Sequence, residues 1–254
     1  MAKLAKKQRR QEARLFLVEG PQATREALAF RPELMEDVFL TPSARERNPD
    51  LVELAQRSGV ELTLASEGVI EHMADTVTPQ GVVAVARYLE VSLDQVMGEK
   101  PTHLVLLHQV KDPGNVGNII RTADAAGVDA VVVTHESVDV FNPKVVRAST
   151  GSLFHIPVVS GVELGPTIQV LADAGVTVLA ADAEGENLGQ LRARGGLMAP
   201  LCWLLGNEAH GLSEEDESLA DQVVSVPMFG QAESLSLQTA AAICIYEAAF
   251  AKNS

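Results

Sequence analysis

Runs of consecutive apolar residues constrain the fold of this chain more than any other feature. Two clear examples are Ala130–Val133 and the near-continuous run His103–Leu107, which opens on a histidine. Because such strands are apolar on both faces, they require helices on both sides of a largely parallel sheet. Further strands are expected at residues 154–159, 176–181, 201–205 and 222–226, and helices near residues 115–126, 143–149, 163–174, 213–219 and 235–252. The second half of the chain is therefore predicted to be an α/β domain.

The front of the chain carries a second, smaller α/β pattern. Short strands are expected at residues 16–18, 38–40, 60–64 and 82–86, alternating with helices over about 21–30, after Pro49 and near 66–73. Mostly polar residues with Gly98 and Pro101 then mark a linker. We predict a domain over residues 1–90, a linker over 91–101 and a second domain over 102–254, which agrees with the length of 254 residues.

Charge is divided unevenly along the chain. The 20 Lys and Arg residues against 34 Asp and Glu residues give a net charge of −14, which argues against a protein that coats nucleic acid by bulk charge. Residues 1–14, expected to form a polar helical arm, carry six basic residues and one glutamate, a net of +5, so the remaining chain carries −19. This basic arm is either a terminus that aids solubility or a nucleic-acid contact. In the second case Arg9, Arg10 and Arg14 are the candidate RNA-binding residues.

The cysteines and the longest apolar stretches exclude several classes of protein. Cys202 and Cys244 are the only cysteines, and both lie inside apolar runs, so neither a disulfide framework nor a cysteine-based zinc site is expected. The histidines show no metal-ligand spacing, and no metal is predicted. No apolar stretch reaches the roughly 18 residues that a membrane span needs, and no apolar signal core follows the basic start. We therefore expect a cytoplasmic protein that does not enter a membrane.

The loop after the strand 103–107 has the composition of a ligand-binding turn. Gly114 and Gly117 allow backbone to approach a ligand, and the helix that follows directs its free N–H groups at the loop. The stretch contains neither a dinucleotide-binding fingerprint nor a P-loop. Arg121 follows Asn115 by six residues and is expected on the same helix face, where its guanidinium either binds phosphate or is an ordinary surface group.

Two further strand-to-loop segments follow. In residues 204–213, Glu208 and His210 are candidates for an acid–base pair. In the alternative, Glu208 fixes the shape of the loop by accepting hydrogen bonds from backbone N–H groups, and His210 only shapes a turn. In residues 226–247, Ser234 and Ser236 stand at a helix start, where hydroxyls normally cap backbone N–H groups. No Gly-x-Ser-x-Gly elbow occurs, which excludes the common serine hydrolase pattern.

Together the three segments resemble the SpoU (TrmH) family of RNA ribose 2′-O-methyltransferases. The resemblance covers roughly residues 103–252, and a weaker similarity near residues 14–21 and 78–84 extends to the family's separate substrate-binding domain, which has a ribosomal-protein-like α/β fold. The matching residues are Asn115, Gly117 and Arg121; Gly206, Asn207 and Glu208 with Gly211, Leu212 and Ser213; and Val226, Pro227, Met228, Gly230, Ser234 and Leu235.

The resemblance implies a SPOUT α/β domain whose C-terminal segment forms a trefoil knot around S-adenosylmethionine, in a homodimer. It implies that Gly206, Val226, Met228 and Leu235 hold the cofactor, largely through their backbone. Arg121 would clamp the RNA phosphate and stabilise the developing alkoxide, since a guanidinium is a poor base. Asn115 would orient Arg121, and Glu208 would brace its loop. Ser234 and Ser236 complete the expected catalytic set, and Arg147 is expected as a second phosphate contact.

One position departs from the family pattern. The third motif usually continues Ser-Leu-Asn, whereas this chain has Ser236 in place of the asparagine. A hydroxyl replaces an amide there, and one hydrogen bond is lost. The expected function is S-adenosylmethionine-dependent 2′-O-methylation of large-subunit (23S) ribosomal RNA. The alternatives are a tRNA 2′-O-methyltransferase, a noncatalytic RNA-binding or ribosome-assembly protein that keeps the knot fold, and a methyltransferase that acts on a base nitrogen.

Overall fold

The structure, a computed structural model, describes residues 2–253, with side chains from Leu4 onward. Contacts between Cα atoms divide the chain into two compact units. The first unit runs to Leu89 and takes in Asp139–His155. The second unit comprises Glu90–Val138 and continues from Ile156 to the end of the chain. The chain therefore leaves the second unit once and returns to it.

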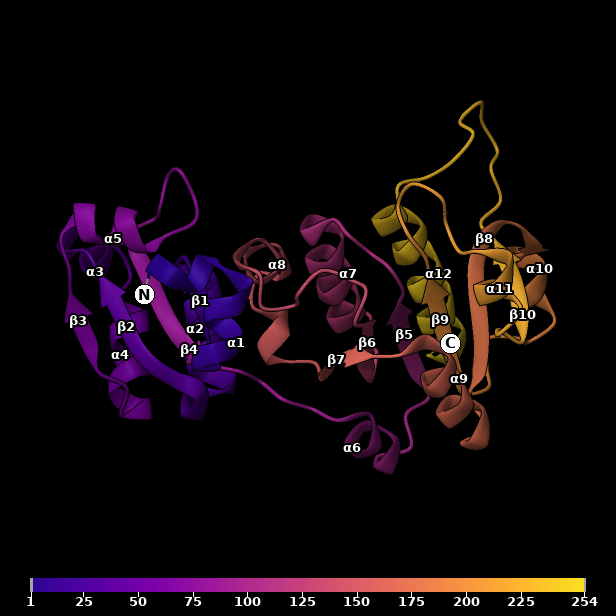
Figure 1. Ribbon diagram of the computed structural model, residues 1–254, viewed down its shortest axis with the longest axis horizontal. Coiled ribbons are helices and arrows are strands. Elements are labelled where there is room, and N and C mark those ends of the chain that lie inside the picture. The colour runs from indigo at the N-terminus through magenta and orange to yellow at the C-terminus, as the bar shows by residue number, and fades with distance from the viewer. Residues whose placement is uncertain (1, 254) are drawn as a thin grey trace. The chain divides into compact units, whose positions relative to one another are not determined.

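A four-stranded mixed sheet forms the centre of the first unit (Figure 1). Its order is β1-β4-β2-β3, with β4 antiparallel to both of its neighbours and β3 parallel to β2. The strands are β1 (Leu15–Glu19), β2 (Met35–Leu40), β3 (Leu62–Leu64) and β4 (Val82–Arg87). The helices are η1 (Ala2–Ala5), α1 (Lys7–Ala13), α2 (Pro21–Phe30), η2 (Pro32–Leu34), α3 (Pro42–Arg47), α4 (Pro49–Ser58), α5 (Glu67–Met73), α8 (Pro143–Ser149) and η3 (Ser152–Phe154).

An aromatic cluster explains why residues 139–155 group with the first unit. The Phe141 ring lies 4.0 Å from the Tyr88 ring and 4.8 Å from the Phe16 ring, measured between centroids. Phe154 stacks on Phe16 at 6.2 Å. Aromatic rings of this size contribute much of the apolar surface that a small core can bury. In chain order this segment lies inside the range 102–254 predicted for the second domain, so the sequence pattern did not reveal its packing.

The second unit is built on a six-stranded sheet in which every neighbouring pair is parallel. Its order is β10-β8-β9-β5-β6-β7, which confirms the predicted parallel α/β architecture. The strands are β5 (His103–Leu107), β6 (Ala130–Thr134), β7 (Val158–Val162), β8 (Thr177–Asn187), β9 (Leu201–Leu205) and β10 (Gln222–Ser225). The helices are α6 (Leu93–Gly98), α7 (Pro113–Ala125), α9 (Leu164–Asp173), α10 (Leu188–Ala193), α11 (Glu214–Glu217) and α12 (Leu237–Lys252).

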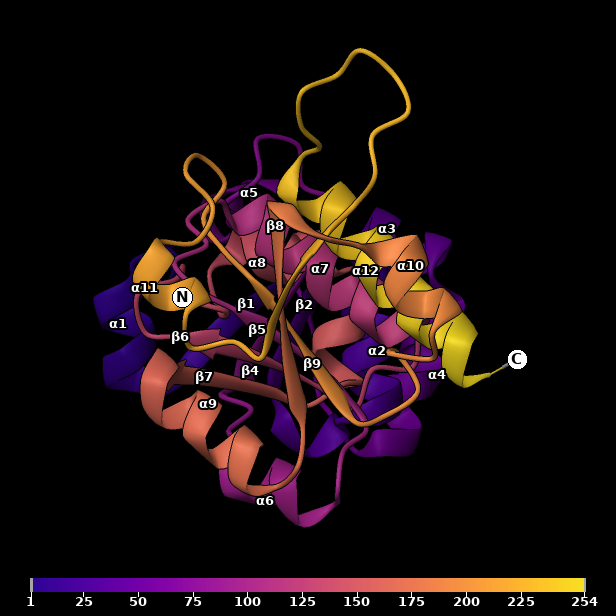
Figure 2. The same cartoon turned by 90° about the vertical axis from the view of Figure 1, so that its right-hand side faces the viewer.

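Helices cover both faces of this sheet, as the apolar strands require (Figure 2). On one face, Leu104 and Leu106 of β5 belong to a buried cluster that includes Leu171 of α9 and Val96 of α6. The other face carries α7, α10 and α12. Because α6 packs on this core, the segment 91–101 predicted as a linker contains a helix that belongs to the second unit.

Two local predictions differ from the structure. The strand expected at residues 154–159 begins only at Val158, because Ser152–Phe154 form a 3-10 turn and Pro157 has no N–H to donate to a ladder. The helices α3, α6 and α10 were not predicted, and each has only six residues. Short helices of this length carry little periodicity.

The two cysteines are buried and unpaired, as the sequence predicts. None of the helices between residues 2 and 253 is both long and apolar enough to cross a membrane.

His103 opens β5 and is 3% exposed. None of the described residues gives its Nε2 atom a hydrogen-bond partner. Burial, aided by the positive charge of Lys252, lowers the pKa of His103 to about 4, although Asp129 acts in the opposite direction. The imidazole is therefore neutral in the folded chain at neutral pH.

This burial predicts acid sensitivity. Between pH 6.5, the ordinary value, and about 4, the unfolded chain binds a proton at His103 that the folded chain does not. The free energy of unfolding should therefore fall by up to about 3 kcal/mol as pH drops through this window. Denaturant titrations of wild type and His103→Leu would show this slope reduced in the variant, whereas His135→Asn, at an exposed histidine, should retain it. An unchanged slope in His103→Leu would contradict the assignment.

Candidate functional site

Three loops leave the sheet of the second unit at the carboxyl ends of parallel strands. They are residues 108–112 after β5, 206–213 after β9 and 226–236 after β10. The two later loops emerge at the same end of the sheet (Figure 2). This end of an α/β sheet is where ligands usually bind. The three sequence motifs therefore lie at one edge of the fold.

The Glu208 carboxylate joins the first two loops. It accepts hydrogen bonds from the backbone N–H groups of Lys111 (3.1 Å) and Asp112 (2.8 Å). It also accepts one from the Asn115 side-chain amide, at 3.2 Å. Partial burial acts to raise the pKa of Glu208, but the donors of Asp112, Lys111 and Asn115 outweigh it and hold that pKa below its ordinary value. The bracing role expected for Glu208 is thus matched by its contacts.

Asn207 shapes the second loop around a close backbone approach. Its side-chain amide donates to the Gln109 carbonyl at 2.8 Å, and its side-chain oxygen accepts from the Ala209 N–H at 2.8 Å. Asn207 and Gly211 also exchange two backbone hydrogen bonds of 3.0 Å. A Cβ atom at Gly206 would lie 2.6 Å from the Gly211 carbonyl carbon, so this position admits only glycine.

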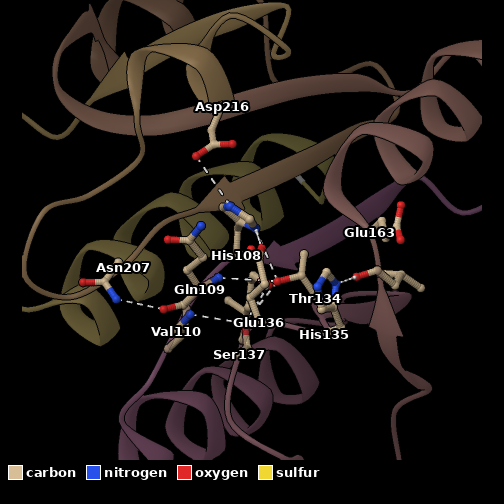
Figure 3. A network of polar contacts seen from close by, with 12 residues as sticks. His108, Gln109, Val110, Thr134, His135, Glu136, Ser137, Glu163, Asn207 and Asp216 are labelled. Carbon is tan, nitrogen blue, oxygen red and sulfur yellow. Dashed lines mark hydrogen bonds and ion pairs between the residues drawn. The ribbon is translucent and has the colours of Figure 1, made fainter.

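A buried polar network holds the first loop against the end of β6 (Figure 3). His108 is 4% exposed, and its Nδ1 atom lies 3.3 Å from the Thr134 hydroxyl. Its Nε2 atom lies 3.5 Å from the Asp216 carboxylate. The Ser137 hydroxyl accepts from the Val110 N–H at 3.2 Å. Sequence reasoning missed these residues, although isolated polar groups at the ends of apolar strands are the available signal.

Asn115 and Arg121 lie on different sides of α7. Six residues turn an α-helix by about 600° and advance it about 9 Å, so the two side chains stand roughly 120° apart around the axis. The expectation of a shared face is therefore wrong. Arg121 is exposed and follows Asn118 by three residues, on the same side of the helix. Since the Asn118 amide donates to Gln238 of α12 at 2.6 Å, Arg121 lies on the side of α7 where α12 begins.

The third loop has few internal contacts. Among the described residues, 227–235 make no backbone hydrogen bonds. Ser234 is exposed, whereas Val226 and Leu235 are half-buried and Met228 is 39% exposed. Ser236 takes the N-cap position of α12, but its hydroxyl lies 2.7 Å from the Thr239 hydroxyl and caps no backbone N–H. The capping expected of these serines is thus not found.

The predicted RNA-binding arginines belong to the first unit, and one of them is buried there. Arg10 is 1% exposed and donates to the carbonyls of Leu4 (2.9 Å) and Ala5 (2.8 Å) and to the Asp139 carboxylate. Its guanidinium is buried and donates from all three nitrogens, which contradicts a role in binding phosphate. The other two residues of the arm remain on the surface: Arg9 pairs with Glu12 at 2.7 Å, and the Arg14 guanidinium lies 4.8 Å from the centre of the Tyr88 ring.

Arg147 is half-buried and lies between two carboxylates. Its guanidinium is 3.3 Å from Glu19 and 3.7 Å from Asp75. Two acidic partners reduce the attraction that this arginine offers to a phosphate, so the predicted phosphate contact at Arg147 is not favoured.

Across the described side chains, no three His, Cys, Asp or Glu residues gather as metal ligands would.

Comparison with known proteins agrees with the motifs. Residues 102–246 match the SpoU rRNA methylase family, and residues 17–91 match the RNA 2′-O ribose methyltransferase substrate-binding domain. The 23S rRNA (guanosine-2′-O-)-methyltransferase RlmB of Bordetella pertussis is 33% identical over 226 residues, which cover 87% of this chain and 91% of the relative. The 23S rRNA (guanosine(2553)-2′-O)-methyltransferase RlmP of Bacillus subtilis is 34% identical over 248 residues, covering 96% and 92%.

A solved structure shows the same fold over nearly the whole chain. The SpoU methyltransferase AviRb from Streptomyces viridochromogenes, in complex with the cofactor AdoMet, superposes with a TM-score of 0.82 at 28% sequence identity. The match covers 98% of this chain and 95% of that structure. The resemblance of the three motifs is thereby confirmed in sequence and in fold, and the chain belongs to the SpoU rRNA methylase family.

Proposed function

We propose that this protein transfers a methyl group from S-adenosylmethionine to a ribose 2′-oxygen of 23S ribosomal RNA, in the cytoplasm and as a homodimer. The observation that carries the proposal is the Glu208 contact set, which joins two motif loops at the carboxyl edge of the sheet. Relatives that match most of the chain are named for 2′-O-methylation of 23S rRNA. The 2′-hydroxyl requirement restricts the substrate to RNA.

The loops fit the cofactor. Gly206 permits the close approach of the Gly211 backbone that shapes the second loop, which any Cβ would block. The unbonded backbone of residues 227–235 offers N–H and carbonyl groups to a polar ligand such as the adenosyl part. In this proposal Gly206, Val226, Met228 and Leu235 hold the cofactor, within the trefoil knot that the family resemblance implies. When bound, the cofactor supplies an electrophilic methyl group on a sulfonium.

The residues of the chain position the nucleophile and stabilise charge. Arg121 offers a guanidinium, so it binds the RNA phosphate and stabilises the negative charge that develops on the 2′-oxygen. Close positioning of the reacting atoms lowers the barrier to transfer. Asn115 contributes through Glu208, to which its amide donates, and Glu208 fixes the two loops. Ser234 and Ser236 supply hydroxyls at the start of α12.

Ser236 supports one alternative. Its hydroxyl is 2.7 Å from the Thr239 hydroxyl, so part of its hydrogen-bonding capacity is used inside the helix. A family asparagine at this position would offer both a donor and an acceptor. The alternative function is therefore a noncatalytic RNA-binding or ribosome-assembly protein with the same fold.

A direct assay tests the proposal. Purified protein with radiolabelled S-adenosylmethionine should label 23S ribosomal RNA and leave tRNA unlabelled. Nuclease digestion and mass spectrometry should place the label on one ribose. Label on tRNA would contradict the proposed substrate, and label on a base would contradict the proposed nucleophile. RNA binding without any transfer would favour the noncatalytic alternative.

Glu208→Gln should weaken cofactor binding. An amide cannot accept from all three donors around Glu208, and its NH₂ group faces N–H groups that need an acceptor. Losing a charge-assisted contact costs about 1.5–3 kcal/mol, or roughly tenfold or more in affinity. Calorimetry with S-adenosylmethionine measures this change. The matched variant Glu215→Gln, at an exposed glutamate on α11, should bind as wild type; equal affinity in both variants would contradict the bracing role.

Arg121→Ala separates binding from chemistry. Cofactor affinity should stay within a few fold, while methyl transfer should fall by about two orders of magnitude or more, as when a preorganised donor is removed. Single-turnover transfer to 23S ribosomal RNA gives the rate. Arg57→Ala, at an exposed arginine that pairs with Glu53 across one helical turn, is the control. Unchanged transfer in Arg121→Ala would remove Arg121 from the mechanism.

A further inference from the structure

A cavity of about 180 Å³ lies wholly within the first unit. It is bounded by the start of α2, the loop between α5 and β4, and the end of α8. Its lining includes Pro21, Gln22, Thr78, Pro79, Gln80 and Arg147. This space is several times what one water needs and smaller than pockets for drug-sized ligands. It suits a single small ring.

The walls of the cavity are fixed to the sheet. The Glu19 carboxylate at the end of β1 accepts from the backbone N–H groups of Asp75 (2.8 Å) and Thr76 (3.2 Å), which pins the loop between α5 and β4. The Gly20 N–H donates to the Val82 carbonyl of β4 at 3.0 Å. Gly20 has φ +91°, a left-handed conformation that lets the chain turn from β1 into α2. The cavity is therefore formed before a ligand arrives.

The charges around the cavity disfavour an anion. Arg147 is the cation of the lining, and it lies 3.3 Å from the Glu19 carboxylate and 3.7 Å from that of Asp75. Two carboxylates beside one guanidinium leave a local charge of about −1 at neutral pH. A phosphate would meet net repulsion here, whereas a neutral ligand would not.

The remaining lining is suited to a flat neutral ring with polar edges. Pro21 and Pro79 supply apolar surface, and Gln80 and Thr78 supply neutral donors and acceptors. Both Gln80 and Thr78 are exposed at the cavity. Next to them Val77 is 96% exposed on the projecting loop between α5 and β4 (Figure 1), so apolar surface continues outside the cavity.

We infer that this cavity receives one unstacked nucleobase of the RNA substrate, with the Gln80 amide bound to the edge of the base. Unpaired bases are the part of RNA that proteins read by side-chain hydrogen bonds and by stacking. The inference rests on the proposed function for the identity of the RNA. It assigns to the first unit a contact that selects sequence and does not depend on phosphate charge.

Two variants of the full chain test the inference, with transcribed 23S ribosomal RNA as the probe. Gln80→Ala removes the edge contact, and Thr78→Trp fills the cavity from an exposed position. Each should raise the Kd for the RNA by about fivefold or more, the cost of a lost base contact. The dependence of Kd on salt should keep its slope, because no phosphate contact is lost. Cofactor affinity by calorimetry should equal that of wild type.

Gln56→Ala, at an exposed glutamine of α4 outside the cavity lining, is the matched control and should leave the Kd unchanged. Wild-type RNA affinity in both cavity variants would overturn the inference while leaving methyl transfer and the proposed function standing. A salt slope reduced by about one would also overturn it, because the cavity would then hold a phosphate. Weaker RNA binding by both variants in a protein that transfers no methyl group would support the cavity and refute the proposed activity.

Discussion

The ionised Glu208 carboxylate is the interaction on which the site depends. It stands in a loop after β9, yet its partners Lys111, Asp112 and Asn115 lie after β5, more than ninety residues earlier in the chain. The strands β5 and β9 are neighbours in the sheet, so the sheet sets the distance between the two loops that follow them. The carboxylate then sets the shape of these loops. Backbone N–H groups that donate to this one carboxylate need no other acceptor. A single side chain thus fixes two of the three ligand loops.

Much of the fold was predictable because buried strands have a recognisable sequence pattern. Strands covered on both faces, such as β5 and β6, read as uninterrupted apolar runs, and their parallel arrangement follows from that pattern. The helix α6 escaped prediction even though Ser92 and Gln95 form a capping box at its start. The packing of Phe141 and Phe154 against Phe16 was not predictable, because contacts separated by more than a hundred residues leave no local pattern.

The sequence proposes residues for the candidate site, but it gives little of their geometry. Motif similarity brought Asn115, Glu208 and Arg121 to attention, but only the folded chain shows that the Asn115 amide serves Glu208. The different faces of Asn115 and Arg121 follow from helix geometry alone. The burial of Arg10 could not be predicted, because a run of basic residues is typical of a protein surface. Its partner Asp139 also lies far along the chain. The trefoil knot stays a prediction of the family resemblance.

The insertion of residues 139–155 in the first unit has a consequence for how the protein is made. During synthesis β1 and β4 are complete long before Phe141 and Asp139 leave the ribosome. Until then the Phe16 and Tyr88 rings lack their contacts with Phe141, and Arg10 lacks its counter-ion. Closure of the first core must therefore wait for a segment encoded between β6 and β7 of the second unit. The first unit therefore cannot complete its core until part of the second unit has been synthesised.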